Sequence, residues 1–372
     1  MSFLITAVAF VVIFSLLILI HEFGHFYFAR RAKIKVDEFG FGLPPRIWGV
    51  KKKGTLWSIN AIPMGGFVRM RGEDDHTGKA SKDPGSFANK SIWQRVQVVV
   101  AGVMMNFLLA WFLLTISFSV GVAPFIVNEA DFNQAVAQGL VKTSVGIGVF
   151  EVAKDSIAEK AGFKKDDIIL KINNQRITKP EEVSDILKKQ AGNTISFSVK
   201  REKDMLEFFA IPDKSDGRIG ISISSAHVIE DIRKIRYPWF VAPLVAFKET
   251  GRLAIATVGL FGDLLRQVVR FNLPENVSGP IGIVQMTHTY VKLGFAELLK
   301  FTALLSLSLG VINIMPLPAL DGGRLLFLFV EFIRRGKGIS PKLEAKIHGI
   351  GFMFLMLLIL AVTWQDILRL FR

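Results

Sequence analysis

The stretch FLITAVAFVVIFSLLILI, residues 3–20, runs directly into HEFGH, residues 21–25. The first part carries no charge and is close to the roughly 20 residues that an α-helix needs to cross a bilayer. On a helix, the i and i+4 spacing points His21 and His25 to one face, where both imidazoles can bind Zn²⁺, and Glu22 between them can activate water. Ionisable groups are costly to bury in a membrane, so those present usually have a function. The sequence therefore predicts a metal site inside a membrane span; the alternative is that the histidines cap the cytosolic end of the helix.

The composition predicts a multi-pass α-helical membrane protein. Of the 372 residues, 51% are hydrophobic. Four segments are long and apolar enough to span a membrane: Phe3–Ala29, Val96–Val122, Leu298–Leu320 and Ile347–Leu368. We expect the first segment to be retained, because it lacks the basic region and the small-residue cleavage site of a signal peptide. The chain has no cysteine, which excludes disulfides and cysteine zinc ligands.

The positive charge follows a membrane pattern. The formal net charge is +14, but the basic residues do not form one tract with interleaved aromatic residues, so we expect no nucleic-acid partner. From Arg30 to Arg95 there are fourteen Lys or Arg and six Asp or Glu, and the loop after the third span is also basic. By the positive-inside rule both loops are cytosolic, which places both termini and the long central domain outside the cytosol.

A catalytic zinc site usually has three protein ligands, so His21 and His25 need a partner. The best candidate is Asp321 in NIMPLPALDGGR, residues 313–324, where two prolines break the third span. His21 lies about 27 Å along an ideal helix from the start of its span, and Asp321 is expected at a similar depth in a span of the same direction. The alternative is an Asp-Gly turn neutralised by Arg324. Three further histidines are weaker candidates: His76, His288 and His348.

HEFGH in the first span, NxxPxPxLDGG in the third and a soluble domain between them resemble the site-2 protease family of intramembrane zinc metalloproteases. The resemblance is closest to the bacterial regulator-of-sigma-E protease branch with a single PDZ domain, and it covers nearly the whole chain. It implies that His21, His25 and Asp321 bind one Zn²⁺ and that Glu22 is the general base. It also implies three substrate-binding residues: Asn313, Pro316 and Pro318.

The segment Val36–Arg71 alternates apolar and polar residues with Gly and Pro between them, which predicts short strands. Strands cannot expose unpaired edges to lipid, so they are shielded by protein or lie at the cytosolic mouth. The resemblance implies a membrane-associated β-hairpin sheet beside the active site. We hypothesise that its free edge pairs with an unwound substrate strand. The alternative is a cytosolic hairpin that makes its strand hydrogen bonds within itself and binds no substrate. Other family-like elements are Ala101-Gly102 with Asn106, and Gly279-Pro280-Ile281, while Val103 stands where relatives often have Pro.

Strand-like runs and two short helices between Val145 and Ile223, with AGFKKDDIILKINNQ at 161–175, resemble a bacterial PDZ domain. Relatives usually have Gly at the positions of Asp166 and Asn174; Asp and Asn best replace Gly at positive φ, so we expect the fold to survive. The domain either binds peptide C termini or excludes large substrates, and we favour exclusion. From Arg236 to Asn272, widely spaced basic residues among apolar ones predict amphipathic helices on the outer leaflet, in contact with lipids, or a packed linker.

The predicted fold is a multi-pass membrane protein with four transmembrane helices, a membrane-associated β-hairpin sheet and an inserted α/β PDZ-like domain. The predicted order is the first span at 1–30, the β-hairpin loop at 31–92, the second span at 93–123, a linker at 124–143, the PDZ-like domain at 144–225, amphipathic helices at 226–293, the third span at 294–323, a cytosolic loop at 324–346 and the fourth span at 347–372.

The predicted function is regulated intramembrane proteolysis in a bacterial cytoplasmic membrane. The resemblance implies single-span membrane proteins as substrates, such as anti-sigma factors or signal-peptide remnants, shortened beforehand by an upstream site-1-type protease. Two alternatives stay open. One is a membrane-anchored zincin whose site faces the cytosol and whose third ligand is not Asp321. The other is a catalytically silent membrane scaffold that uses the PDZ-like domain; the intact Glu22 argues against it.

Overall fold

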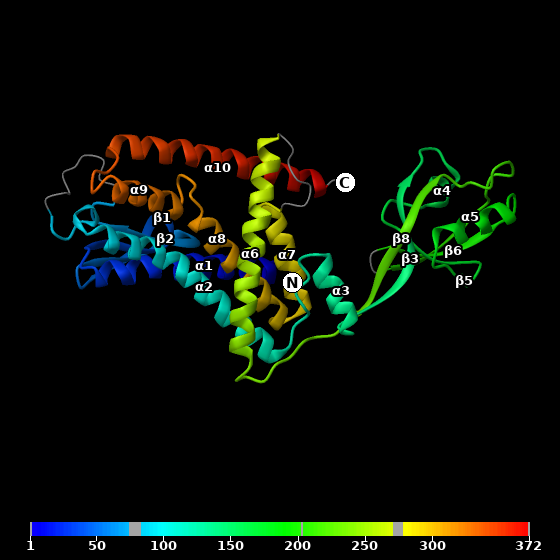
Figure 1. Ribbon diagram of the computed structural model, residues 1–372, viewed down its shortest axis with the longest axis horizontal. Helices are drawn as coiled ribbons and strands as arrows, with labels where there is room; N and C mark the ends of the chain where they lie inside the picture. The colour runs from blue at the N-terminus through cyan, green and yellow to red at the C-terminus, as the bar shows by residue number, and fades with distance from the viewer. Residues whose placement is uncertain (1, 74–82, 202–203, 271–277, 371–372) are drawn as a thin grey trace. The chain divides into compact units, whose positions relative to one another are not determined.

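The computed structural model describes residues 2–73, 83–201, 204–270 and 278–370, and the chain divides into two compact units (Figure 1). One unit comprises Met1–Val122 and Arg236–Arg372, and the other comprises Ala123–Ile235. Four described helices are long and apolar enough to cross a membrane: Leu4–Arg31 in α1, Ile92–Val120 in α2, Phe295–Ile314 in α8 and Lys342–Arg369 in α10. Each of the four predicted apolar segments overlaps one of these helices.

Three of these helices pack directly on one another: α1 (Ser2–Arg31), α2 (Ile92–Val120) and α8 (Phe295–Ile314). Small residues allow the close approach. A Cβ atom at Gly24 of α1 would lie 2.5 Å from the Ala101 carbonyl oxygen of α2, and one at Gly310 of α8 would lie 3.2 Å from the Phe107 ring. α10 (Pro341–Leu370) is mostly exposed in the isolated chain, as expected of a helix that faces lipid.

The third apolar segment departs from the prediction. α8 ends at Ile314 instead of Leu320, because Met315 precedes Pro316 and takes the extended conformation that a residue before proline favours. A separate helix, α9 (Asp321–Ile333), then occupies part of the stretch that we predicted as a cytosolic loop. Asp321 is therefore the first residue of a new helix and does not lie at the end of the helix that precedes it.

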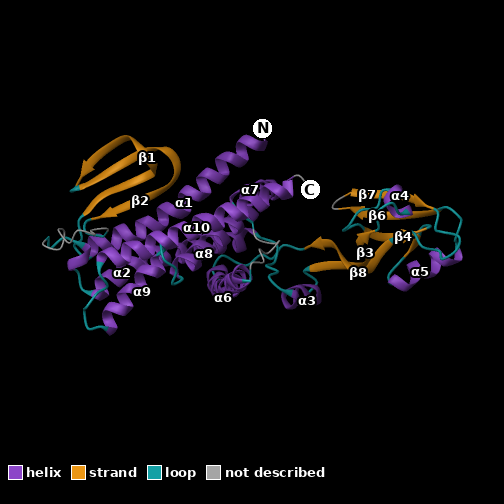
Figure 2. Ribbon diagram, turned by 90° about the horizontal axis from the view of Figure 1, so that it is seen from above, coloured by secondary structure: helices purple, strands orange, loops and turns teal. Residues whose placement is uncertain are grey.

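The segment Val36–Arg71 folds as an antiparallel pair, β1 (Val36–Lys52) and β2 (Thr55–Met70), which confirms the prediction of strands. The first part of β1 pairs with both halves of β2: Phe39 is opposite Trp57 on one side and Val68 on the other. Within the described residues, the end of β2 therefore has a strand partner on one side only. Figure 2 shows this hairpin sheet beside α1.

Two further helices complete this unit. α6 (Ala242–Val269) runs across the direction of α1 and α10 in both views, and α7 (Pro280–Leu293) packs on α1 and α8 (Figures 1 and 2). The predicted stretch Arg236–Asn272 thus contains one long helix, and its residues 271 and 272 lie outside the described part. Exposed apolar side chains occur along α6: Leu244, Phe247, Ile255, Val258 and Leu260.

The second unit is built on an antiparallel sheet with the strand order β7-β6-β4-β3-β8. Its strands are β3 (Val141–Val152), β4 (Ile168–Ile172), β6 (Ile195–Arg201), β7 (Asp204–Ala210) and β8 (Ile221–Ile232), with β5 (Gln175–Arg176) paired to β4. The helices are α3 (Glu129–Ala137), α4 (Ile157–Ala161) and α5 (Pro180–Lys189). Asp166 and Asn174 have φ of 69° and 65°, so both take the conformation predicted for residues that replace Gly.

One buried ion pair connects β6 to the turn before β4. The Asp167 side chain is fully buried, and Arg201 donates to it from Nε at 2.7 Å and from Nη2 at 2.8 Å. The hydrogen bonds to this carboxylate raise the pKa of Arg201 above its ordinary value. The pair lies beside the core of the unit, which includes Ile147, Ile169 and Phe197.

We predict that Arg201→Met destabilises the unit Ala123–Ile235, because the substitution leaves the buried Asp167 carboxylate without its cation. The expected loss in the free energy of unfolding is about 3 kcal/mol. It is measured by thermal unfolding and limited proteolysis of the full chain. The control is Arg176→Met, which removes an exposed partner 3.7 Å from Glu230 and costs at most about 1 kcal/mol. Equal stability of the two variants would contradict the prediction.

Candidate metal centre

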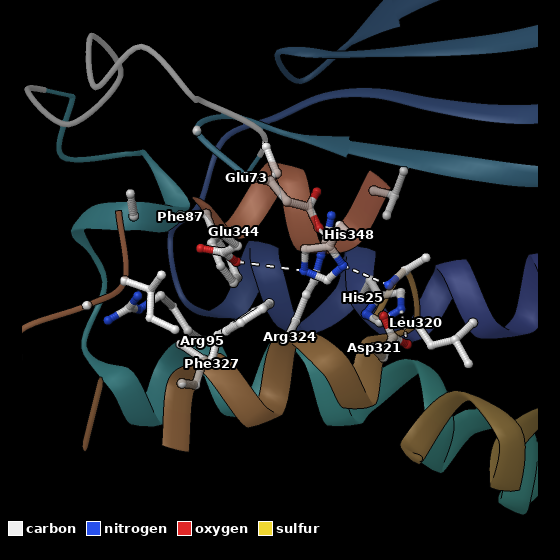
Figure 3. Close-up of a pocket in the computed structure, with 18 of the residues that line it drawn as sticks. His25, Glu73, Phe87, Arg95, Leu320, Asp321, Arg324, Phe327, Glu344 and His348 are labelled. Atoms are coloured by element: carbon white, nitrogen blue, oxygen red, sulfur yellow. Dashed lines mark hydrogen bonds and ion pairs between the residues drawn. The ribbon is translucent and has the colours of Figure 1, made fainter. Parts of the chain in front are cut away.

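The structure brings together the three side chains that we predicted as metal ligands. His21 and His25 come from α1 and Asp321 from the first turn of α9. Figure 3 shows His25 and Asp321 close together. Asp321 Oδ2 lies 3.1 Å from His21 Nε2 and 3.3 Å from His25 Nε2, and the two imidazole nitrogens are 3.2 Å apart. Each residue offers one ligand atom to the same small volume.

The chemistry of this cluster fits a bound cation. His25 Nδ1 lies 2.8 Å from the carbonyl oxygen of Val98, which can only accept, so Nδ1 carries the proton and Nε2 presents a lone pair to the cluster. Among the described residues, Asp321 Oδ2 is buried with the two imidazole nitrogens as its polar neighbours and makes no hydrogen bond to any other group. Two imidazole nitrogens and one carboxylate oxygen form a typical donor set of catalytic zinc, with a fourth position left for water.

Gly102 of α2 makes room for the imidazoles. A Cβ atom at this position would overlap His25 Nε2 and lie 2.9 Å from His21 Cε1. Together with the contact between Gly24 and Ala101, this places the backbone of α2 directly against the two histidines. The helix pair α1–α2 therefore determines where the rings lie.

Glu22 lies on the same cavity as the three ligand candidates. The cavity has a volume of about 730 Å³, and its wall includes residues of α1, β2, α9 and α10. Glu22 Oε2 accepts a hydrogen bond of 3.0 Å from the backbone N–H of Val68. Val68 lies at the end of β2, which in the described part of the chain has a strand on one side only. The carboxylate is thus oriented by the hairpin sheet beside the cluster.

The loop between α8 and α9 determines the position of Asp321. Gly322 and Gly323 lie so close to the backbone of residues 314–318 that a Cβ atom on either would overlap it. Ala319 has φ of 74°, and its N–H donates a 2.8 Å hydrogen bond to His348 Nδ1 of α10. α10 therefore supports the turn that precedes the carboxylate.

Ion pairs lie further along the same cavity (Figure 3). Arg95 of α2 donates to Glu331 of α9 at 3.0 Å, and Arg324 pairs with Glu73. Asp321 itself faces the two imidazoles. These charged groups make one end of the cavity polar.

The predicted substrate-binding residues occupy different surroundings. Asn313 Nδ2 lies 3.4 Å from His21 Nε2, at the edge of the cluster. Pro318 packs against Gly351 of α10, and Pro316 is exposed. The weaker histidine candidates do not join the cluster in the described part of the chain. His288 Nδ1 lies 2.7 Å from Thr6 Oγ1, and His348 Nδ1 accepts from the Ala319 N–H. His76 lies outside the described residues.

The sequence singled out Gly102 and Asn106 as family-like and His348 as a weaker ligand candidate, but it did not indicate the contacts that these residues make at the site. It gave no indication of the Val98 carbonyl or the Val68 N–H. Asn106 had a usable signal, because it is an amide within an apolar span, where buried polar groups are expected to have partners. The two backbone groups carry no signal in the sequence.

We predict that Gly102→Ala abolishes metal binding at this site, because the new methyl group takes the space of the His25 imidazole. Metal content after dialysis should fall to background, measured by elemental analysis of the purified chain. Gly259→Ala in α6 is the matched control, since a Cβ atom there meets nothing within 4 Å. Full metal content in Gly102→Ala would show that the rings do not lie against α2.

Known proteins are similar to this chain over nearly its whole length. The family model "Peptidase family M50" matches residues 9–358. A zinc metalloprotease RasP of Oceanobacillus iheyensis is 32% identical over 98% of this chain and 99% of its own length. A putative zinc metalloprotease of Clostridium acetobutylicum is 34% identical, with 99% and 98% of the two chains covered. The regulator of sigma-W protease RasP of Bacillus subtilis is 30% identical, with 99% and 100% covered.

Among solved structures, a PDZ domain of an SdrC-like protein from Listeria monocytogenes covers 21% of this chain at 22% identity with a TM-score of 0.19, too low to support a fold assignment. The family match, by contrast, extends over nearly the whole chain, and its span includes HEFGH and Asp321. The chain therefore belongs to peptidase family M50, the site-2 protease family of intramembrane zinc metalloproteases.

Proposed function

We propose that His21, His25 and Asp321 hold one Zn²⁺ and that Glu22 is the general base for hydrolysis of peptide bonds within membrane segments. The observation that carries this proposal is the meeting of two imidazoles from α1 with a carboxylate from α9, at distances of 3.1 and 3.3 Å. The same contact speaks against a zincin whose third ligand is another residue. No described feature favours a silent scaffold.

The chemistry divides between the ion and the chain. A zinc ion bound here polarises the scissile carbonyl and lowers the pKa of water. Glu22 accepts a proton from the attacking water and delivers it to the leaving amine. The Val68 N–H holds the Glu22 carboxylate in place while it is ionised.

Hydrolysis inside a membrane also requires water and an unwound substrate. The cavity of about 730 Å³ carries charged groups at one end, which supports water entry from that side. A peptide bond in a helix is shielded by its own hydrogen bonds, so it has to unwind before attack. The Asn313 amide, 3.4 Å from His21, is well placed to satisfy a substrate backbone group freed by unwinding, and Pro316 and Pro318 keep the neighbouring backbone open.

The end of β2 is the proposed docking edge for the unwound segment. Gly66–Met70 pairs with β1 on one side, and Val68 on this edge contacts Glu22. A substrate strand added to this edge by β-augmentation would pass beside the catalytic carboxylate. The alternative is a hairpin that makes its strand hydrogen bonds within itself and binds no substrate.

The proposed substrates are single-span membrane proteins already shortened by an upstream site-1-type protease. The name of the Bacillus subtilis relative, regulator of sigma-W protease, supports anti-sigma factors as one class. Signal-peptide remnants are a second class. We place the protein in a bacterial cytoplasmic membrane, with both termini and the PDZ-like domain outside the cytosol, on the positive-inside pattern.

We predict that Glu22→Gln keeps zinc but lowers the rate of cleavage by about 10²–10⁴-fold, because only the proton acceptor is lost. Asp321→Asn should lose both zinc and cleavage. The measurement is zinc content and cleavage of a pre-trimmed single-span substrate in liposomes. Asp263→Asn, at an exposed acid paired with Arg266, is the control and should behave as wild type. Undiminished cleavage by both site variants would place the chemistry elsewhere.

A further inference from the structure

Each imidazole that binds metal through one ring nitrogen needs a hydrogen-bond partner for the other ring nitrogen, and this partner determines which nitrogen carries the proton. A histidine that binds metal through Nε2 holds its proton on Nδ1, and a hydrogen bond from that N–H to an acceptor orients the ring. For His25 the acceptor is the Val98 carbonyl of α2, at 2.8 Å. The equivalent partner of His21 lies two turns further along α2.

That partner is the side chain of Asn106. Its amide lies 3.3 Å from His21 Nδ1, and the residue is fully buried. Because α1 and α2 run in opposite directions, His25 meets the Val98 end of this helix face and His21 meets the Asn106 end, with Gly102 between them. One face of α2 therefore serves both imidazoles.

The two orientations of the amide place the His21 proton on different nitrogens. If the NH₂ group points at Nδ1, that nitrogen accepts, and the neutral imidazole carries its proton on Nε2, toward Asp321. If the carbonyl oxygen points at Nδ1, it accepts the Nδ1–H and leaves the Nε2 lone pair for a metal. With the NH₂ orientation, Asn106 Oδ1 is buried without a hydrogen-bond partner among the described residues.

We infer that Asn106 is a positioning residue: its carbonyl oxygen accepts the Nδ1–H of His21 and holds the imidazole in the tautomer that binds zinc. This inference deepens the proposed function and rests on its zinc site. Rotation of the amide gives the orphaned oxygen a partner and frees His21 Nε2 for the ion. A free lone pair on Nε2 of both histidines then matches the two-imidazole donor set.

The test measures the zinc dissociation constant of the full-length protein in detergent, by competition with a chelator. Asn106→Leu and Asn106→Ala remove the acceptor and should weaken zinc binding by about 10–100-fold. Asn106→Asp keeps an oxygen acceptor in either protonation state and should bind zinc within about threefold of wild type or more tightly, because carboxylates are common acceptors for zinc-bound histidines. The visible spectrum of the Co²⁺-substituted protein should change in Asn106→Leu and stay close to wild type in Asn106→Asp.

Ser306→Ala is the matched control. Ser306 Oγ of α8 donates a 2.8 Å hydrogen bond to the backbone carbonyl of Asn106, so its loss disturbs the packing around the same residue but leaves the side-chain amide unchanged. It should lower thermal stability and leave zinc affinity at the wild-type value.

Two results would overturn the inference. One is wild-type zinc affinity in both Asn106→Leu and Asn106→Ala. The other is an equal loss in Asn106→Asp and Asn106→Ala, which would show that the amide acts through packing alone. Failure of the wild-type protein to bind zinc would instead refute the proposed function, so the two failures are distinguishable.

Discussion

The contact between α1 and α2 at Gly24 and Gly102 is the constraint on which the rest of the site depends. With no side chain at either position, the helix backbones approach closely, and the imidazoles of His21 and His25 lie against α2. In a bilayer such close packing replaces the hydrophobic effect as the main source of helix association. The same contact brings the Val98 carbonyl within 2.8 Å of His25, so it orients the ring as well as placing it.

A second constraint is the interruption of the third apolar segment. A continuous helix through residues 315–320 would leave no turn from which a carboxylate could reach α1. Proline ends α8 at Ile314, and two adjacent glycines allow α9 to begin tightly against the preceding turn. His348 of α10 then binds the backbone of Ala319, two residues before Asp321. The Ala319 N–H, which the break in the helix leaves without a helical acceptor, is thus satisfied by a side chain of the protein.

Much of this arrangement could be predicted from the sequence, because its signals are local. The four apolar segments, the spacing of His21 and His25, the strands of the hairpin and the positive φ of Asp166 and Asn174 are all readable from short windows. The prolines predicted a break in the third segment, but the helix that begins at Asp321 was not predicted, since a loop was expected after residue 323. The groups around the cluster depend on contacts between segments far apart in sequence, such as Val68 N–H with Glu22 and Ala319 N–H with His348, and a backbone amide leaves no mark on composition.

The most direct test of the central claim is X-ray absorption at the zinc edge of the purified protein. The account predicts one zinc per chain, with two imidazole nitrogens and the remaining ligands oxygen, all at about 2.0–2.2 Å. Because the chain has no cysteine, no thiolate sulfur is expected in the shell. Absence of zinc, or a shell with three or more imidazoles, would contradict the site formed by His21, His25 and Asp321.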